Sequence, residues 1–300
     1  MHILDLIKQI EQRIDSEIDR PVVRNQYAWW LLERCTGRTK SNLIVQHDIT
    51  LSAAQEAQLD HWLHQINVEH KPLAYIFGDV PFGPLTIQVK PPVLIPRMET
   101  EEWALAIVER IQQQHLKNLR ILDLCCGSGC IAALFAHALP YAEIWAADIC
   151  PDAIALTNKN KQALQLNNIT IMQSDLFAAL PKDAPFDLIV SNPPYITSDE
   201  YQNLDVSVRS WEHEHALRAD DHGLALIKKI IAQAPSYLRP HRALADAGIN
   251  QLFIEIGWQQ GPAVADIMQK NDWHNVMISK DSAGKDRVVQ GSISNVALAQ

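Results

Sequence analysis

The segment FDLIVSNPPY, residues 186–195, is the part of the chain whose residue types most clearly suggest chemistry. An apolar run leads directly into Asn192, Pro193, Pro194 and Tyr195. Because proline has a fixed φ and no N–H, this turn should be rigid and should present hydrogen-bond acceptors. The Asn192 side-chain oxygen and the Pro193 carbonyl oxygen can each accept one N–H of a planar –NH2 group. A plain strand-ending turn would explain one proline but not the whole tetrapeptide.

Such a turn suits the activation of an amide nitrogen. This nitrogen is a poor nucleophile because its lone pair is delocalised into the carbonyl group. Holding both N–H groups would orient the π face of the nitrogen toward an electrophile, and such positioning can contribute roughly 7–11 kcal/mol. Tyr195 could pack its ring against the flat substrate group. We therefore predict that Asn192, Pro193 and Tyr195 are catalytic and that residues 192–195 bind the substrate.

A glycine-containing turn precedes this segment in ILDLCCGSGC, residues 121–130. Small residues after an apolar strand let the backbone approach a ligand, at the strand end where open sheets form their crevices. Gly127-Ser128-Gly129 alone is weak evidence. A dinucleotide-binding loop would carry a third glycine, where this chain has Ala132.

A carboxylate follows about twenty residues later, where Asp148 ends the apolar segment WAAD. It could accept hydrogen bonds from both hydroxyls of a ribose, or it could simply cap the next helix. Together with the glycine turn it favours a cofactor that contains adenosine. The two elements alone do not separate a nucleotide from S-adenosylmethionine, but the Asn-Pro-Pro-Tyr turn downstream favours S-adenosylmethionine.

Three regions should position these residues. Apolar residues at helical spacing indicate a small helical domain over residues 1–74. Residues 75–97 are rich in Pro and Gly and predict a β-hairpin connector. Residues 98–300 alternate helices and strands, which indicates an α/β domain with a mostly parallel sheet covered on both faces. The expected strands are 120–124, 143–147, 170–172, 186–191 and 251–255, and the expected helices are 101–114, 130–138 and 152–164.

The composition excludes several other classes. The net charge of −9 argues against a surface that grips nucleic acid through phosphates. Five cysteines without paired spacing argue against a disulfide framework and a structural zinc site. No apolar run approaches the roughly 20 residues of a membrane span. We expect a soluble, cytoplasmic protein that acts as a monomer.

Several motifs in order make the chain resemble the protein-(glutamine-N5) methyltransferases that modify peptide-chain release factors. Besides the Asn-Pro-Pro-Tyr turn, the matching segments are PLAYIFGDVPFGPL (72–85), VLIPRMETEEW (93–103), SDLF (174–177), IEIGWQQG (254–261) and KDSAGKDRVV (280–289). The resemblance covers about residues 70–290.

The resemblance implies a Rossmann-like class I methyltransferase domain with a seven-stranded sheet, preceded by a helical domain that helps to hold the release factor. Its substrate would be the glutamine of a Gly-Gly-Gln loop. Carried over residue by residue, the cofactor contacts would be Cys125, Cys126, Gly127, Ser128, Gly129, Asp148, Leu176 and Asn192. The substrate contacts would be Asn192, Pro193, Pro194 and Tyr195.

The chain departs from the family pattern at three places. Cys125 and Cys126 replace Gly-Thr in the cofactor loop, and we interpret both thiols as small packing residues. His213 stands where the family has proline, within WEHEHAL (211–217). No second ligand cluster accompanies this Glu/His alternation, so we predict no metal. An insertion is expected around residues 242–250.

Two other substrates remain open. A ribosomal-protein glutamine methyltransferase shares nearly all these motifs. A DNA or RNA adenine N6-methyltransferase would also hold a planar –NH2 group. The acidic charge and the Ile-Pro-Arg-x-Glu-Thr-Glu segment count against the nucleic acid.

Overall fold

The computed structural model describes residues 1–15 and 21–293. The chain forms two compact units. The first comprises Met1–Gly78 together with Asp205–Trp211, and the second comprises Asp79–Leu204 and Glu212–Gln300. Each unit has its own apolar core. In the described part of the chain, no helix is both long and apolar enough to cross a membrane.

The first unit is a small helical bundle. Ile3, Ile7 and Ile10 recur at helical spacing and are buried. Ser52 begins the fourth helix with a capping box to Gln55, which satisfies backbone N–H groups that a helix start leaves unpaired. The helices are α1 (Ile3–Arg13), α2 (Pro21–Thr36), α3 (Lys40–Gln46), α4 (Ala53–Asn67), α5 (Leu73–Phe77) and α10 (Val206–Trp211).

The helix α10 groups with this bundle although it lies far along the chain. The indole Nε1 of Trp211 donates to the Glu69 carbonyl oxygen at 2.9 Å. The ammonium of Lys71 lies 5.1 Å from the centre of the Trp211 ring. The segment that follows the Asn-Pro-Pro-Tyr turn therefore contributes a helix to the bundle.

The second unit contains a seven-stranded sheet in the order β5-β4-β3-β6-β7-β9-β8. The first five strands in this order are parallel, and β9 and β8 are antiparallel to their neighbours. The strands are β3 (Arg120–Leu124), β4 (Glu143–Asp148), β5 (Ile169–Gln173), β6 (Leu188–Ser191), β7 (Leu252–Glu255), β8 (His274–Lys280) and β9 (Asp286–Ser292). A separate hairpin pairs β1 (Asp79–Phe82) with β2 (Leu85–Gln88).

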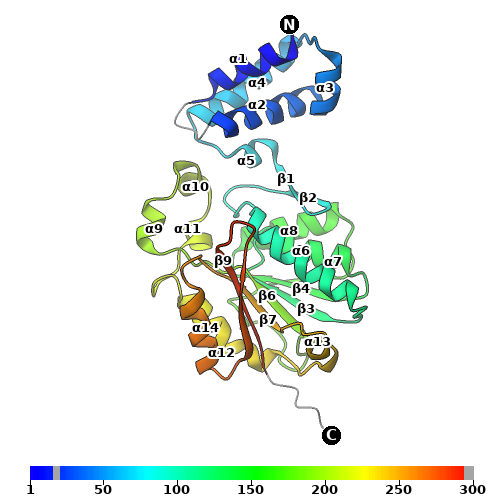
Figure 1. The fold of residues 1–300 in the computed structure, drawn as a ribbon, viewed down its shortest axis with the longest axis vertical. Helices are drawn as coiled ribbons and strands as arrows, with labels where there is room; N and C mark the ends of the chain where they lie inside the picture. The colour runs from blue at the N-terminus through cyan, green and yellow to red at the C-terminus, as the bar shows by residue number, and fades with distance from the viewer. Residues whose placement is uncertain (16–20, 294–300) are drawn as a thin grey trace. The chain divides into compact units, whose positions relative to one another are not determined.

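Helices cover both faces of this sheet (Figure 1). Alternate residues of β3 belong to different apolar clusters: Ile121 packs with α6 and α7, whereas Leu122 packs with α12 and α14. This alternation follows from the period of two along a strand. The helices of the unit are α6 (Met98–Gln113), α7 (Cys130–Ala138), α8 (Pro151–Ala163), α9 (Ser198–Gln202), α11 (Glu214–Leu217), α12 (Ala225–Gln233), α13 (Arg242–Asp246) and α14 (Gly261–Lys270), with a 3-10 turn at Ala234–Tyr237.

These findings confirm the predicted α/β class and the seven-stranded, mostly parallel sheet. The strand expected at 186–191 begins two residues later, at Leu188. Phe186 instead forms an isolated bridge with Leu238. The short helix α13 occupies the expected insertion and buries Leu244 in the core. The hairpin lies within the expected connector, and the boundaries at 74 and 97 stay predictions.

Candidate active site

The predicted site residues lie at the carboxyl ends of neighbouring parallel strands, which together form one edge of the sheet. The register pairs Leu124 of β3 with both Ala147 of β4 and Ser191 of β6. The glycine loop, Asp148 and Asn192 come directly after these three residues. The strand order runs outward from β3 to β4 and β5 and then returns to β6 on the other side of β3. This edge is the topological switch point, where open α/β sheets bind ligands.

The glycine loop, residues 125–129, is held in place by α8. The Thr157 hydroxyl donates to the Gly127 carbonyl oxygen at 3.0 Å. The Asn160 amide donates to the Ser128 carbonyl oxygen at 2.9 Å. Both bonds fix backbone atoms of the loop from outside, so the shape of the loop depends little on its own side chains.

The two glycines of the loop serve different purposes. A Cβ on Gly129 would lie 2.5 Å from Thr157 Cγ2, so the close approach of α8 requires glycine there. A Cβ on Gly127 would meet nothing within 4 Å. Both residues have positive φ, +75° and +56° respectively. The space beside Gly127 is therefore open to a ligand.

The two adjacent cysteines of the loop are thiols that pack. Cys125 adopts φ +61°, the left-handed conformation that glycine tolerates best. Its side chain packs against the apolar cluster below the loop, and Cys126 Sγ lies 3.6 Å from Thr157 Oγ1. Burial raises the pKa of both thiols above their ordinary value. They remain protonated at neutral pH, which fits small packing residues and not reactive thiolates.

Asp148 connects β4 to the glycine loop. Its Oδ2 accepts from the Gly127 N–H and its Oδ1 from the Cys150 N–H, both at 2.9 Å. Burial raises the pKa of this carboxyl group, and the backbone donors act against that shift. Each carboxylate oxygen has a second lone pair. Asp148 thus accepts from two backbone N–H groups and keeps lone pairs that these donors do not use.

Leu176 follows β5 at the same edge. The backbone N–H of Ser174 donates to the Asp148 carbonyl oxygen at 2.9 Å, which attaches this segment to the end of β4. Leu176 is 7% exposed and packs in the apolar cluster. Ile149, the apolar residue directly after Asp148, is 60% exposed.

The turn at 192–195 leaves two acceptors free. Asn192 Nδ2 donates to Thr100 Oγ1 at 3.1 Å. Within residues 1–15 and 21–293, no hydrogen bond reaches Asn192 Oδ1 or the Pro193 carbonyl oxygen. Pro193 is buried, and Pro194 is partly exposed. These acceptors are the pair that the sequence assigned to a planar –NH2 group.

Tyr195 is held at both ends. Its hydroxyl donates to Glu255 Oε1 at 3.2 Å. Its carbonyl oxygen accepts from Gln260 Nε2 at 3.0 Å. A Cβ on Gly223 would lie 2.0 Å from that same oxygen, so only glycine fits there. Burial raises the pKa of the tyrosine hydroxyl, which therefore stays protonated at neutral pH.

Glu255, the last residue of β7, is the central residue of this network and was not predicted as part of the site. Its Oε2 accepts from Thr100 Oγ1 at 2.7 Å and from Trp103 Nε1 at 2.8 Å, and its Oε1 accepts from Tyr195. It is 1% exposed. Burial raises its pKa, and its hydrogen-bond donors and the Arg287 charge act against the shift. The signal was present in the late Glu-Ile-Gly-x-x-Gln-Gly motif, which also contains Gln260.

An ion pair between Arg97 and Glu212 connects the segments 93–103 and 211–217. Arg97 Nη2 contacts both carboxylate oxygens of Glu212, at 2.9 and 2.6 Å. The Glu212 side chain is fully buried and the Arg97 side chain is 34% exposed. Burial raises the pKa of Glu212, and the Arg97 charge opposes this. The pair anchors the start of the segment that carries His213.

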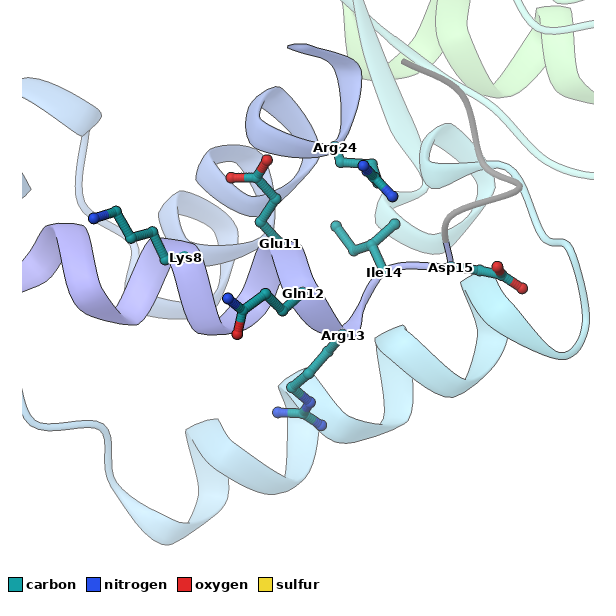
Figure 2. A pocket seen from close by; sticks show the side chains of 7 residues that line it. All are labelled: Lys8, Glu11, Gln12, Arg13, Ile14, Asp15 and Arg24. Atoms are coloured by element: carbon teal, nitrogen blue, oxygen red, sulfur yellow. The ribbon is translucent and has the colours of Figure 1, made fainter. Parts of the chain in front are cut away.

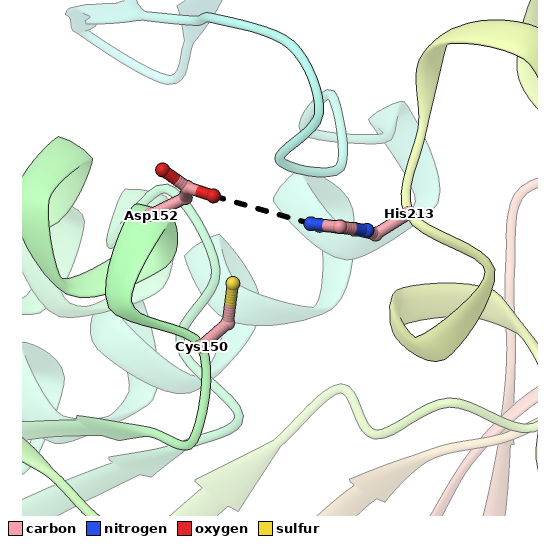
Figure 3. Close-up of side chains that lie close together, drawn as sticks. All are labelled: Cys150, Asp152 and His213. Atoms are coloured by element: carbon pink, nitrogen blue, oxygen red, sulfur yellow. Dashed lines mark ion pairs between the residues drawn. The ribbon is translucent and has the colours of Figure 1, made fainter.

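One group in the described part of the chain brings three potential metal ligands close together: Cys150, Asp152 and His213 (Figure 3). Their ligand atoms lie within 4.8 Å of one another. The histidine Nε2 and the Asp152 Oδ2 are 4.0 Å apart, and these two side chains are 44% and 64% exposed. Exposed pairs of this kind are common on protein surfaces. The expectation that no metal is bound stays a prediction.

A cavity of about 470 Å³ lies in the helical unit. Figure 2 shows that mainly charged and amide side chains line it, among them Glu11, Arg13 and Arg24. Arg13 also pairs with the exposed Asp60 at 2.5 Å. None of the lining residues was assigned to the cofactor or the substrate.

Two family models match the chain. One, described as the PrmC N-terminal domain, matches residues 5–78, and one described as a Methyltransferase small domain matches residues 102–209. Among solved structures, the hMettl16 catalytic domain in complex with MAT2A 3′UTR hairpin 6 aligns with a TM-score of 0.54. That alignment covers 84% of this chain and 87% of the other, at 13% identity, and shows a likeness of fold alone.

Curated relatives match over most of their length. The release factor glutamine methyltransferase of Escherichia coli is 38% identical over 261 residues, which cover 87% of this chain and 89% of the relative. The proteins of the same name from Pasteurella multocida and Flavobacterium psychrophilum are 37% and 32% identical and cover 87% and 94% of this chain. The two alignments cover 88% of the Pasteurella multocida protein and 96% of the Flavobacterium psychrophilum protein. With this identity over nearly their whole length, the chain belongs to the release factor glutamine methyltransferase family.

Proposed function

We propose that the chain transfers the methyl group of S-adenosylmethionine to the side-chain amide nitrogen, N5, of the glutamine in the Gly-Gly-Gln motif of a peptide-chain release factor. One observation carries the proposal. The turn after β6 offers Asn192 Oδ1 and the Pro193 carbonyl oxygen, and no donor of the described residues occupies either one. Acceptors on adjacent residues match the two N–H groups of a primary amide. The names of the relatives select glutamine as the bearer of that amide.

The residues at the edge of the sheet fit S-adenosylmethionine as the methyl donor. The open space beside Gly127 admits a ligand close to the backbone. Asp148 keeps lone pairs for the ribose hydroxyls, and the exposed Ile149 offers an apolar surface to a flat ring. When bound, the cofactor supplies a methyl group on a positively charged sulfur, an electrophile that needs only a well-placed nucleophile.

The chain supplies that placement. Asn192 and Pro193 hold the two amide N–H groups and so turn the π face of the nitrogen toward the methyl group. Tyr195 offers its ring to the flat amide. Its hydroxyl is protonated and bonded to Glu255, so it acts as a donor within the network and not as a base. No dedicated base is needed, because the methylated nitrogen is acidic enough to release its proton to water.

Other acceptors of the methyl group have less support. Neither a ribosomal-protein glutamine nor an adenine amino group is favoured by a specific observation in the described residues. The net charge of −9 weakens binding to nucleic acid. We further expect the enzyme to act as a monomer in the cytoplasm, where release factors act.

The test incubates the purified chain with tritiated S-adenosylmethionine and, in separate reactions, with a release factor, a large-subunit ribosomal protein and duplex DNA. The proposal predicts label on the release factor and on neither of the others. Label on the ribosomal protein alone would mean that the ribosomal protein, and not a release factor, is the substrate. Label on DNA alone would overturn the assignment to a protein substrate.

A further inference from the structure

The orientation of the Asn192 side chain decides whether the proposed reaction site works. An asparagine amide has an acceptor end and a donor end of nearly the same shape. Only the oxygen end can accept an N–H from the substrate. If the amide were turned round, two donors would face each other and the substrate nitrogen would lose a contact. The site therefore needs a device that fixes this orientation.

Thr100 is such a device because its single hydroxyl proton is already used. Thr100 Oγ1 donates to Glu255 Oε2 at 2.7 Å, and an ionised carboxylate can only accept. The hydroxyl oxygen can therefore only accept from Asn192. Asn192 Nδ2 lies 3.1 Å from it, which turns Oδ1 away from Thr100. The directions of the two hydrogen bonds, from Asn192 to Thr100 and from Thr100 to Glu255, thus follow from the charge on Glu255.

We propose that Glu255, acting through Thr100, is a positioning residue that fixes the Asn192 amide with its oxygen toward the substrate. This role rests on the proposed function of Asn192. Thr100 lies in the first turn of α6 and Glu255 ends β7, 155 residues further along the chain. The Ile-Pro-Arg-x-Glu-Thr-Glu and Glu-Ile-Gly-x-x-Gln-Gly segments therefore meet at the reaction site.

The surroundings of Glu255 fit a functional role. Thr100 is 2% exposed and Glu255 is 1% exposed, so water cannot easily replace either partner. A buried carboxylate is costly, and burial raises the pKa of Glu255. Among the described residues, the titratable groups that interact with it include the Tyr195 hydroxyl, the Arg287 guanidinium and the Cys130 thiol. A carboxylic acid at this position could donate to Thr100 and release the constraint on Asn192.

The first test compares Thr100→Val with Thr100→Ser. Valine keeps the shape of threonine but has no hydroxyl, and serine keeps the hydroxyl. We expect kcat with a release factor to fall about 10- to 100-fold for valine, somewhat less than the loss of a direct transition-state contact. Serine should retain most of the turnover. Calorimetric binding of S-adenosylmethionine should stay within roughly threefold for both variants, because hydrogen bonds elsewhere hold the cofactor loop.

The outcomes separate this inference from the proposed function. If the wild-type chain does not methylate a release factor, the proposed function fails. If it does, and Thr100→Val has wild-type kcat, the positioning role is wrong. Equal losses in the valine and serine variants would mean that Thr100 serves packing and not orientation.

A pH profile tests the part played by Glu255. The folded pKa of Glu255 lies above its ordinary value of 4.5, so protonation begins at a higher pH than for an exposed glutamate. Wild-type kcat should fall as the pH decreases through that raised pKa. Glu255→Gln should be slow at all pH values and should lack this acid limb. The same acid limb in Glu255→Gln would contradict the inference.

Discussion

The two halves of the site are built in different ways. On the cofactor side, α8 holds the loop 125–129 through its backbone carbonyl groups. On the substrate side, buried side chains from α6 and β7 and the half-buried Gln260 after β7 hold the turn 192–195. The first half depends on main-chain shape, and the second depends on the identity and charge of individual side chains.

This difference fits one of the departures that the resemblance to the family implies, the one in the cofactor loop. The cofactor loop carries Cys125 and Cys126 in place of Gly-Thr and still closes around the open space beside Gly127. The substrate turn keeps Asn192, Pro193, Pro194 and Tyr195 unchanged. A backbone-built loop tolerates new side chains as long as their conformation is accessible. A turn built from oriented side chains does not, because a single lost donor changes the direction of its hydrogen bonds.

The largest effect should come from Asn192→Ala. Removing the side-chain acceptor leaves the substrate amide held only by the Pro193 carbonyl oxygen. We expect kcat to fall by about 10²–10³, as for the loss of one directed hydrogen bond at a transition state. Steady-state kinetics with a release factor measure this. Asn203→Ala is the matched control, since Asn203 is exposed and its side chain donates to the Asp199 carbonyl oxygen within its own helix end. Equal activity of the two variants would contradict the role of Asn192.

An intermediate effect should come from Asp148→Asn. The change removes the charge that the ribose hydroxyls would meet and places an –NH2 beside backbone donors. We expect the Kd for S-adenosylmethionine to rise about 10- to 100-fold, the usual loss for hydrogen bonds to a charged group. At saturating cofactor, kcat should change far less. Asp152→Asn, an exposed acid on α8, should leave Kd as it was. A drop in kcat without a change in Kd would show that Asp148 does not belong to the cofactor half of the site.

The smallest effect should come from Cys125→Gly, and it should be stabilising. Cys125 has φ +61°, which costs a non-glycine residue about 1–2 kcal/mol. The greater freedom of glycine in the unfolded chain and the lost packing of the Cys125 side chain offset part of this gain. We expect a net gain of about 0.5 kcal/mol in the free energy of unfolding, measured by urea denaturation.

The neighbouring thiol provides the control for that experiment. Cys126 is 4% exposed and is absent from the residues with positive φ in the described part of the chain. Cys126→Gly should therefore destabilise the fold, because it loses packing without relieving strain. Stabilisation by both substitutions, or by neither, would show that backbone strain does not distinguish the two positions.

The sequence predicted the frame of the catalytic unit because each strand and helix carries its own local signal. β3 and α7 match the predicted residues at both ends, since an apolar run and a glycine turn delimit them. β6 begins two residues later than predicted, although the Asp187 N–H still donates to the Arg120 carbonyl oxygen of β3 at 2.8 Å. The Phe186 N–H donates to the Tyr237 carbonyl oxygen at 2.7 Å and so pairs outside the seven-stranded sheet.

The network around Glu255 could not be predicted in the same way. The sequence placed Asn192 and Asp148 at strand ends, where chemistry was expected. It gave no measure of the distance between Thr100 and Glu255, which lie 155 residues apart. Only the packing of α6 against the end of β7 brings them together. Long-range side-chain bonds of this kind depend on the tertiary fold and have no local pattern.

Methylation of the Gly-Gly-Gln glutamine is tested most directly by mass spectrometry of a release factor after incubation with the enzyme and S-adenosylmethionine. Fragmentation of the peptide that contains Gly-Gly-Gln locates the added methyl group. We predict a single methyl group on the glutamine side-chain nitrogen, absent after incubation with Asn192→Ala. A methyl group on another residue of the release factor, or an unmodified glutamine with an enzyme that binds the cofactor, would contradict this prediction.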